Sequence, residues 1–280
     1  MKNYEIGLYE KSMPNDLTLK EKLKCSKECG FDFMEISIDE TDEKLSRLNM
    51  TKDERVDLIK AMYEEQLYIR TMCLSGHRKY PLGSLDENTR EKSLDIMKKA
   101  IDLADDLGIR IIQLAGYDVY YEDSNEQTKE LFESNLKKCV EMASKKGIIL
   151  AFETMETEFM NTIEKSMYYV DKINSPYLKV YPDCGNITNA CKVYNTDVLD
   201  DFETGRGNIA AVHLKETVPG KFREIPFGQG HVNFEDVIDK ALNMGVRKFV
   251  AEFWYCGEDD FKKTIKEAKA FMDDKFSLKI

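Results

Sequence analysis

The stretch SKKGIILAFET, residues 144–154, combines the end of a helix with a buried strand that finishes in an acid. Gly147 suits the position just after a helix, where a positive φ is needed. Residues 148–152 are all apolar, which is typical of a strand covered on both faces in a parallel sheet. Glu153 follows directly, and a carboxylate that leaves an apolar core is costly unless another group compensates its charge. The stretch therefore predicts one unit of an alternating α/β fold, with a binding partner at the end of its strand.

The same pattern recurs along the chain, with a glycine between a helical segment and a run rich in Ile, Val, Phe and Leu. Three further examples are KECGFDFMEISI, DDLGIRIIQLAG and LNMGVRKFVAEFWY. Predicted helices between the strands include Leu19–Cys29, Asn88–Leu107, Lys129–Lys145 and Phe261–Asp274. The predicted strands lie near residues 4–9, 32–38, 68–74, 110–115, 148–153, 178–182, 209–214 and 247–254.

Eight strand–helix units in 280 residues predict a (β/α)₈ TIM barrel that forms a single domain over residues 1–280. No linker rich in Pro, Gly or Ser interrupts the alternation. A doubly wound sheet uses the same alternation, but no G-x-G-x-x-G follows the first predicted strand. GRGN at 205–208 precedes a strand and is in the wrong place for that role.

Charge and composition limit the class of partner. The formal net charge is −11, which argues against a protein that binds nucleic acid through its phosphates. The N-terminal residues contain no apolar run of signal-peptide length, and no segment approaches the roughly 18 apolar residues of a membrane span. Seven cysteines, an odd number without close framework spacing, fit a reducing compartment. We therefore expect a cytoplasmic protein without membrane contact.

The last four predicted strands carry acids or an imidazole at their carboxyl ends, where barrels place their active sites. A single acid there is explained by capping of the next helix, but four such residues in succession are not. Three carboxylates brought together raise one another's pKa unless a cation neutralises them. The pattern therefore predicts one divalent metal ion, Zn²⁺, Mn²⁺, Co²⁺ or Mg²⁺. The predicted ligands are Glu153, Asp183, His213 and Glu252.

Long phrases of the chain resemble the L-ribulose-5-phosphate 3-epimerases, also called L-xylulose-5-phosphate 3-epimerases, of the xylose isomerase-like TIM barrels. The phrases are IDETDEKLSRL, MCLSGHRKYPLGS, IIQLAGYDVYYE, YPDCGN and AVHLKETVPGKFREIPFGQG, and the resemblance covers nearly the whole chain. It implies inversion at C3 of a pentulose 5-phosphate through an enediolate. It also implies a homodimer, the same four metal ligands, and an acid–base pair formed by Glu153 and Glu252.

The chain departs from related ketose epimerases at two positions. The residue three beyond the aspartate ligand faces substrate in those enzymes, often as histidine, and here it is Asn186. A substrate arginine shortly after their histidine ligand has no counterpart at the same spacing. The first departure implies a different contact at this position, and the second argues against a free ketose as the main substrate.

Basic residues that follow the third and the seventh predicted strands are candidates for phosphate binding. His77 and Arg78 follow the third strand. Lys215, Lys221 and Arg223 follow the seventh strand, where many barrels hold phosphate, although such residues also occur in solvated loops. Tyrosines of GYDVYYE are suited to stacking on a sugar or to packing against a partner subunit. The predicted substrate contacts are Asn186, Lys215, His77, Arg78 and Tyr117.

Two other functions use the same site. An aldose–ketose isomerase of the hydroxypyruvate isomerase type moves the proton between C1 and C2 with the same ligands. A non-catalytic sugar-phosphate-binding barrel would keep the fold without turnover, although an intact ligand set argues against this. The DNA-repair endonucleases of the superfamily use more metal-binding histidines than the three present here, and the charge also disfavours them.

Overall fold

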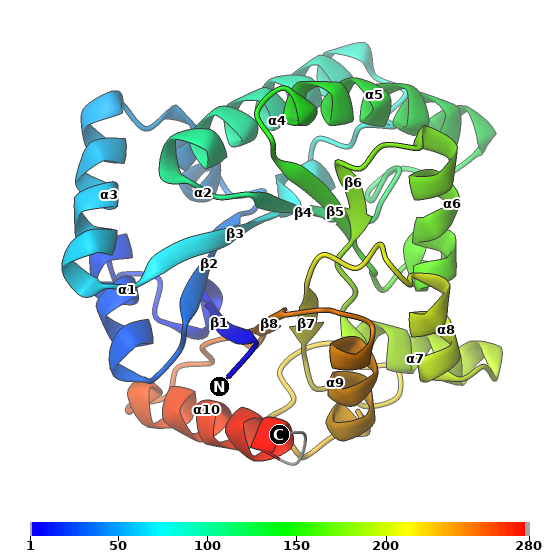
Figure 1. Cartoon of the computed structure of the whole chain (residues 1–280). Helices are drawn as coiled ribbons and strands as arrows, with labels where there is room; N and C mark the ends of the chain where they lie inside the picture. Colours follow the sequence, from blue (N-terminus) through cyan, green and yellow to red (C-terminus); the bar gives the residue numbers. More distant parts are fainter. Residues whose placement is uncertain (1, 278–280) are drawn as a thin grey trace.

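The computed structural model describes residues 2–277 as a ring of parallel strands with the helices outside it (Figure 1). The helices are α1 Leu19–Glu28, α2 Asp42–Ser46, α3 Lys52–Glu65, α4 Glu87–Leu107, α5 Glu126–Ser144, α6 Ile163–Ile173, α7 Cys184–Tyr194, α8 Val198–Thr204, α9 Phe234–Asn243 and α10 Phe261–Ser277. The strands are β1 Glu5–Tyr9, β2 Phe33–Ile38, β3 Tyr68–Leu74, β4 Ile111–Ala115, β5 Ile149–Glu153, β6 Leu178–Val180, β7 Val212–Leu214 and β8 Lys248–Ala251.

The eight strands form one sheet in the order β6-β5-β4-β3-β2-β1-β8-β7, and all the pairs are parallel. Two isolated parallel bridges close the barrel: Val180–Ile209 joins β6 to the segment before β7, and Asp183–His213 joins the segment after β6 to β7. There the Ala210 N–H donates to the Val180 carbonyl at 2.9 Å. The predicted (β/α)₈ barrel is therefore confirmed, with its closing seam made of short pairings.

The four glycines that mark the helix-to-strand boundaries all adopt a positive φ, as the sequence predicts. The angles are 85° at Gly30, 75° at Gly108, 64° at Gly147 and 90° at Gly245. This left-handed conformation is strained for residues with a Cβ, so glycine ends each helix and turns the chain into the next strand.

Three strands are shorter than predicted by two or more residues. β6 ends at Val180 rather than 182, β7 begins at Val212 rather than 209, and β8 ends at Ala251 rather than 254. Half of the extra residues are buried and the others are half-buried. Near the ends of β6 and β7 the two strands are joined only by the isolated bridges of the seam.

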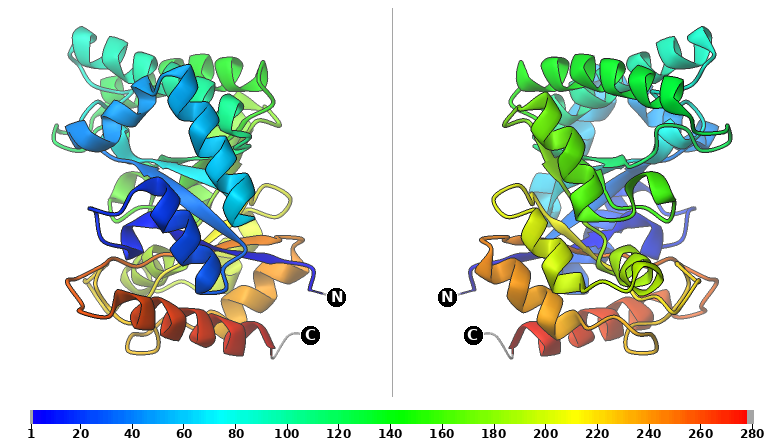
Figure 2. Two further views of the ribbon diagram at one scale, coloured as in Figure 1. Left: turned by 90° about the vertical axis from the view of Figure 1, so that its left-hand side faces the viewer. Right: turned by 90° about the vertical axis from the view of Figure 1, so that its right-hand side faces the viewer.

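The helices cover the outer face of the barrel on all sides. Figure 2 shows α1 and α3 on one side and α6 and α8 on the opposite side. An apolar layer fills the space between strands and helices, and it extends to the rings of Tyr4 and Phe276, which stack with centroids 4.3 Å apart. Among residues 2–277, no helix has the length and apolar character needed to cross a membrane.

A second apolar cluster occupies the inside of the barrel, with one residue from each strand or its extension. Because side chains alternate along a strand, the residue two positions further points the same way. Glu153 is two residues after Ala151, and Glu252 is two residues after Val250, so both acids face the barrel axis. The cluster consists of Tyr9, Phe33, Cys73, Ile111, Ala151, Tyr181, Ala211 and Val250.

Candidate active site

The four predicted ligands converge at the carboxyl ends of the strands. Glu153 is the last residue of β5, Asp183 is the N-cap of α7, His213 lies within β7, and Glu252 directly follows β8. All four are buried, and one ligand atom from each lies within 4.8 Å of the ligand atoms of the others. Chain segments about 100 residues apart are thus brought to one point by the parallel sheet.

The imidazole of His213 stands between two of the acids. Its Nδ1 lies 2.8 Å from Glu252 Oε2 and 3.3 Å from Glu153 Oε1. Ligand atoms that lie within 4.8 Å of one another are close enough for these four residues to hold one ion. The donor set, three carboxylates and one imidazole, fits a divalent metal.

The electrostatics of the cluster favour an added cation. Burial, strengthened by the nearby Glu252, raises the pKa of Glu153, and burial raises the pKa of Asp183 to about 8. Burial would also raise the pKa of Glu252, but Lys215 and His213 outweigh it and hold that pKa low. A bound divalent ion would stabilise all three carboxylates in the charged form.

Lys215 is the cation closest to the acids. Its Nζ lies 2.5 Å from Asp183 Oδ2 and 4.0 Å from Glu252 Oε2, and its side chain is buried. Burial disfavours the ammonium form, but Asp183 and Glu252 more than compensate and raise its pKa. Lys215, which the sequence predicts to contact the substrate, therefore lies directly beside the four predicted metal ligands.

Asp183 also caps the N-terminus of the helix that follows it, α7. Its Oδ1 accepts from the Asn186 N–H at 2.9 Å, which caps α7 and leaves Oδ2 toward Lys215. Asn186 donates from Nδ2 to the Thr154 carbonyl at 2.8 Å. Its buried Oδ1 has no hydrogen-bond partner among residues 2–277.

The ligand cluster opens into a cavity bounded by basic and aromatic side chains. Arg78 lies in it, with its guanidinium carbon 4.8 Å from the centre of the Tyr120 ring. The Arg78 guanidinium carbon also lies 5.8 Å from the centre of the Tyr117 ring, and the Tyr117 hydroxyl donates to Glu156 Oε2 at 2.7 Å. The cavity is lined by Tyr9, Lys11, Cys73, Ser75, Arg78, Glu153, Met155, Glu156, Asn186, Lys215, Phe222, Arg223, Glu252 and Trp254.

Three candidates from the sequence do not line this cavity: Tyr117, His77 and Lys221. His77 is buried, and its Nε2 lies 3.1 Å from the Ser93 carbonyl of α4, so it faces away from the ligands. Lys221 is exposed, and its backbone pairs with that of Val218 across a turn in the loop after β7.

Two acids of the site were missed by the sequence reasoning. Glu156 lines the cavity, three residues after Glu153. Glu35 lies under the cluster in β2, where every residue is buried. An acid in the middle of an apolar strand is the signal that could have found it, since such a residue needs partners.

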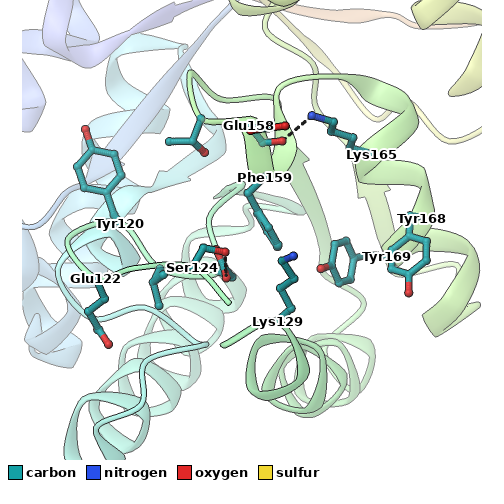
Figure 3. Close-up of a pocket in the computed structure, with 12 residues that line it drawn as sticks. Tyr120, Glu122, Ser124, Lys129, Glu158, Phe159, Lys165, Tyr168 and Tyr169 are labelled. Carbon is teal, nitrogen blue, oxygen red and sulfur yellow. Dashed lines mark hydrogen bonds between the residues drawn. The ribbon is translucent and has the colours of Figure 1, made fainter. Parts of the chain in front are cut away.

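A separate cavity lies between the loops that follow β4 and β5, beside α5 and α6 (Figure 3). Tyr169, Phe159 and Lys129 approach one another there, and Ser124 donates to Asp118 at 2.7 Å. None of the four predicted ligands lines it. Glu153 and Glu252 line the cavity above the barrel axis instead.

Comparison with known proteins agrees with this architecture. Residues 23–275 match the family model described as xylose isomerase-like TIM barrel. A D-allulose 3-epimerase from Methylomonas sp., solved in complex with D-allulose, superposes with a TM-score of 0.80 at 15% identity over 98% of both chains. A structure of an L-ribulose 3-epimerase gives a TM-score of 0.78 at 17% identity, over 98% of this chain and 95% of that one. At these identities the superpositions support the fold, and the class is that of the xylose isomerase-like TIM barrels.

Sequence comparison narrows the class further. The L-ribulose-5-phosphate 3-epimerase UlaE of Escherichia coli (strain SE11) is 42% identical over 269 residues, which cover 96% of this chain and 93% of the relative. The corresponding protein of Shigella sonnei (strain Ss046) is 42% identical over 267 residues, which cover 95% of this chain and 93% of that relative. The chain belongs to the L-ribulose-5-phosphate 3-epimerase family.

Proposed function

We propose that the chain is a metal-dependent epimerase that inverts C3 of a pentulose 5-phosphate and interconverts L-ribulose 5-phosphate and L-xylulose 5-phosphate. The observation that carries the proposal is the convergence of Glu153, Asp183, His213 and Glu252 at one point above the barrel axis. The 42% identity to enzymes named for this reaction selects it among the reactions that such a centre can support.

The four converging side chains would hold one divalent ion, with Zn²⁺, Mn²⁺, Co²⁺ and Mg²⁺ as the candidates. A bound ion supplies Lewis acidity, which stabilises negative charge on the oxygens of the enediolate. The protein contributes the fixed donor set, whose buried carboxylates repel one another until a cation is present.

Glu153 and Glu252 are proposed to transfer the proton at C3. Inversion requires one group to remove the proton from one face and another to return it to the opposite face. Both carboxylates line the cavity, and both contact His213 Nδ1 from different strands of the barrel. A positioned acid or base of this kind typically contributes about 10²–10⁴-fold in rate.

Asn186 and Lys215 are proposed to bind the sugar next to the ion. The unpaired Oδ1 of Asn186 is an acceptor for a substrate hydroxyl, since a buried amide oxygen is costly without a partner. Lys215 offers a positive charge where an anionic sugar oxygen would develop.

We propose that Arg78 and Arg223 bind the phosphate at the outer part of the cavity. Both guanidinium groups lie over aromatic rings of the cavity region, Arg78 over Tyr120 and Arg223 over Trp254 at 5.5 Å. Guanidinium groups bind phosphate through paired hydrogen bonds. Tyr117 supports this part of the cavity through its hydrogen bond to Glu156, which lines the cavity. The position of His77 gives it no part in this contact.

Incubation of the metal-loaded protein with L-ribulose 5-phosphate in D₂O tests the function. We expect L-xylulose 5-phosphate as product and deuterium at C3. Label at C1 or C2 would indicate an isomerase, and metal binding without turnover of either pentulose phosphate would indicate a non-catalytic barrel. E153Q and E252Q should each lose exchange at C3. E158Q, at an exposed acid on the loop after β5, is the matched control and should retain it.

The homodimer and the cytoplasmic location expected from the sequence remain predictions. Tyr121 and Tyr168 are 68% and 57% exposed, and Tyr168 lines the cavity of Figure 3. Large exposed aromatic side chains favour an interface. Sedimentation velocity of the wild type and of Y168K tests the dimer, because a lysine in a dimer interface would shift the species toward monomer.

A further inference from the structure

A buried carboxylate in the middle of β2 has no role in the proposed reaction. Glu35 is completely buried, and the strand around it, FMEISI, is buried at every position. Moving a carboxylate out of water costs several kcal/mol unless hydrogen bonds and opposite charge compensate it. Its neighbours therefore show what it does.

Three donors from three other strands or strand extensions meet at this carboxylate. Glu35 Oε2 accepts from Thr71 Oγ1 at 2.7 Å and from the Tyr181 hydroxyl at 2.9 Å. Glu35 Oε1 lies 2.6 Å from His213 Nε2. All these side chains are fully buried, so water does not compete for the carboxylate.

The contact with Glu35 decides which ring nitrogen His213 presents to the ligand cluster. With an ion on Nδ1, the ring would keep its proton on Nε2, which is placed to donate to Glu35 Oε1 across the 2.6 Å contact. The opposite nitrogen, Nδ1, faces Glu153 and Glu252. A metal ligand must offer an unprotonated nitrogen, and Nδ1 is the one placed to do so.

We propose that Glu35 is a positioning residue that fixes the tautomer and orientation of His213 for metal binding. The inference rests on the proposed metal site and adds the residue that organises it from below. Thr71 and Tyr181 hold the Glu35 carboxylate in turn, and the Tyr181 ring also packs on the His213 ring with centroids 4.8 Å apart. The histidine is thus oriented both by a charged hydrogen bond and by ring packing.

The expected effect is on metal affinity. Loss of the outer partner of a metal-bound histidine typically weakens metal binding by about 10–100-fold. E35Q keeps the shape but removes the charge and allows the amide to donate toward Nε2, which favours the wrong tautomer. We expect E35Q to bind Co²⁺ about 10–100-fold more weakly than the wild type, with a changed visible absorption spectrum of the bound ion.

Matched variants separate positioning from general damage to the barrel interior. Ser37 is two residues further along β2, fully buried, and accepts from the Tyr9 hydroxyl without contacting His213. S37A should keep the Co²⁺ affinity and spectrum of the wild type. T71V and Y181F each remove one hydrogen bond to Glu35 and should weaken Co²⁺ binding by a smaller factor, and they carry the test if E35Q does not fold.

The outcomes distinguish this inference from the proposed function. If the wild type binds Co²⁺ and turns over substrate while E35Q, T71V and Y181F keep wild-type affinity and spectrum, Glu35 does not position the ligand. A fall in thermal stability of these variants without any change in affinity or spectrum would likewise overturn the positioning role. If the wild type itself binds no divalent ion, the metal site fails and the role of Glu35 fails with it.

Discussion

The Lys215 ammonium group lies 2.5 Å from Asp183 Oδ2, which places a buried positive charge against one of the proposed metal ligands. The same ammonium is 4.0 Å from Glu252 Oε2. In the ion-free chain this lysine compensates part of the charge of the acids. A divalent ion held by the acids would take over that compensation, so the lysine and the ion act on the same carboxylates.

Replacement of Lys215 by methionine should therefore destabilise the ion-free protein more than the metal-loaded protein. Removal of one partner of a buried ion pair costs about 3–5 kcal/mol. We expect a large fall in the thermal midpoint of K215M in EDTA and a greater gain than the wild type on addition of Mn²⁺. K221M, at an exposed lysine further along the same loop, is the control and should behave as the wild type. Equal gains from Mn²⁺ in K215M and wild type would contradict the shared role.

Two substitutions at Asp183 separate its capping role from its ligand role. Asparagine caps a helix about as well as aspartate, whereas alanine loses about 1 kcal/mol. Because both D183N and D183A lose the charged ligand, both should bind Co²⁺ much more weakly than the wild type. In EDTA, D183A should be less stable than D183N by about 1 kcal/mol, measured by urea unfolding. Wild-type Co²⁺ affinity in D183N would show that Oδ2 is not a ligand.

The convergence of the four predicted ligands could be inferred from the sequence because each lies at or near the carboxyl end of a strand. A parallel barrel brings all such ends to one rim, so the order of strands along the chain is sufficient. Glu35 lies inside its strand and contacts a residue 178 positions away, and only the closed barrel brings the two together. The pattern of β2 therefore showed that the acid is unusual without showing its partner.

The residues that line the cavity were harder to predict because neighbouring loop residues face different ways. His77 and Arg78 are adjacent, but Arg78 lines the cavity while His77 turns to the Ser93 carbonyl. Residues 75–78 form a short 3₁₀ turn, in which consecutive side chains point in different directions around the axis. Sequence cannot decide which of the two reaches a ligand without that geometry.

Gly185 allows the close approach of α7 to the segment after β7. A Cβ at this position would lie 2.7 Å from the Lys215 carbonyl and 2.7 Å from Thr217 Cγ2. G185A should therefore displace the backbone that carries Lys215, with a loss of about 1–3 kcal/mol in the free energy of unfolding. It should also weaken Co²⁺ binding. T188A, one turn further along α7, tests the effect of a change in the helix alone and should leave Co²⁺ affinity unchanged.

His77 should make the stability of the protein depend on pH. Burial lowers the pKa of His77 to about 4, and the hydrogen bond to the Ser93 carbonyl offsets only part of this. In the unfolded chain the pKa is about 6.5, so between pH 6.5 and 4 the unfolded state binds the proton more readily. The stability from neutral His77 is complete above pH 6.5 and is lost as the pH falls toward 4.

H77Q keeps a side-chain N–H for the Ser93 carbonyl but cannot titrate. Wild type should lose about 2–3 kcal/mol more than H77Q between pH 7.5 and pH 4.5, as measured by urea unfolding at each pH. His213 and the acids of the ligand cluster are present in both proteins, so their contributions cancel in the difference. Parallel pH curves for the two proteins would show that His77 is not the group responsible. A raised KM for the sugar phosphate in H77Q at pH 7.5, with stability unchanged, would return His77 to the substrate-binding role that the sequence predicted.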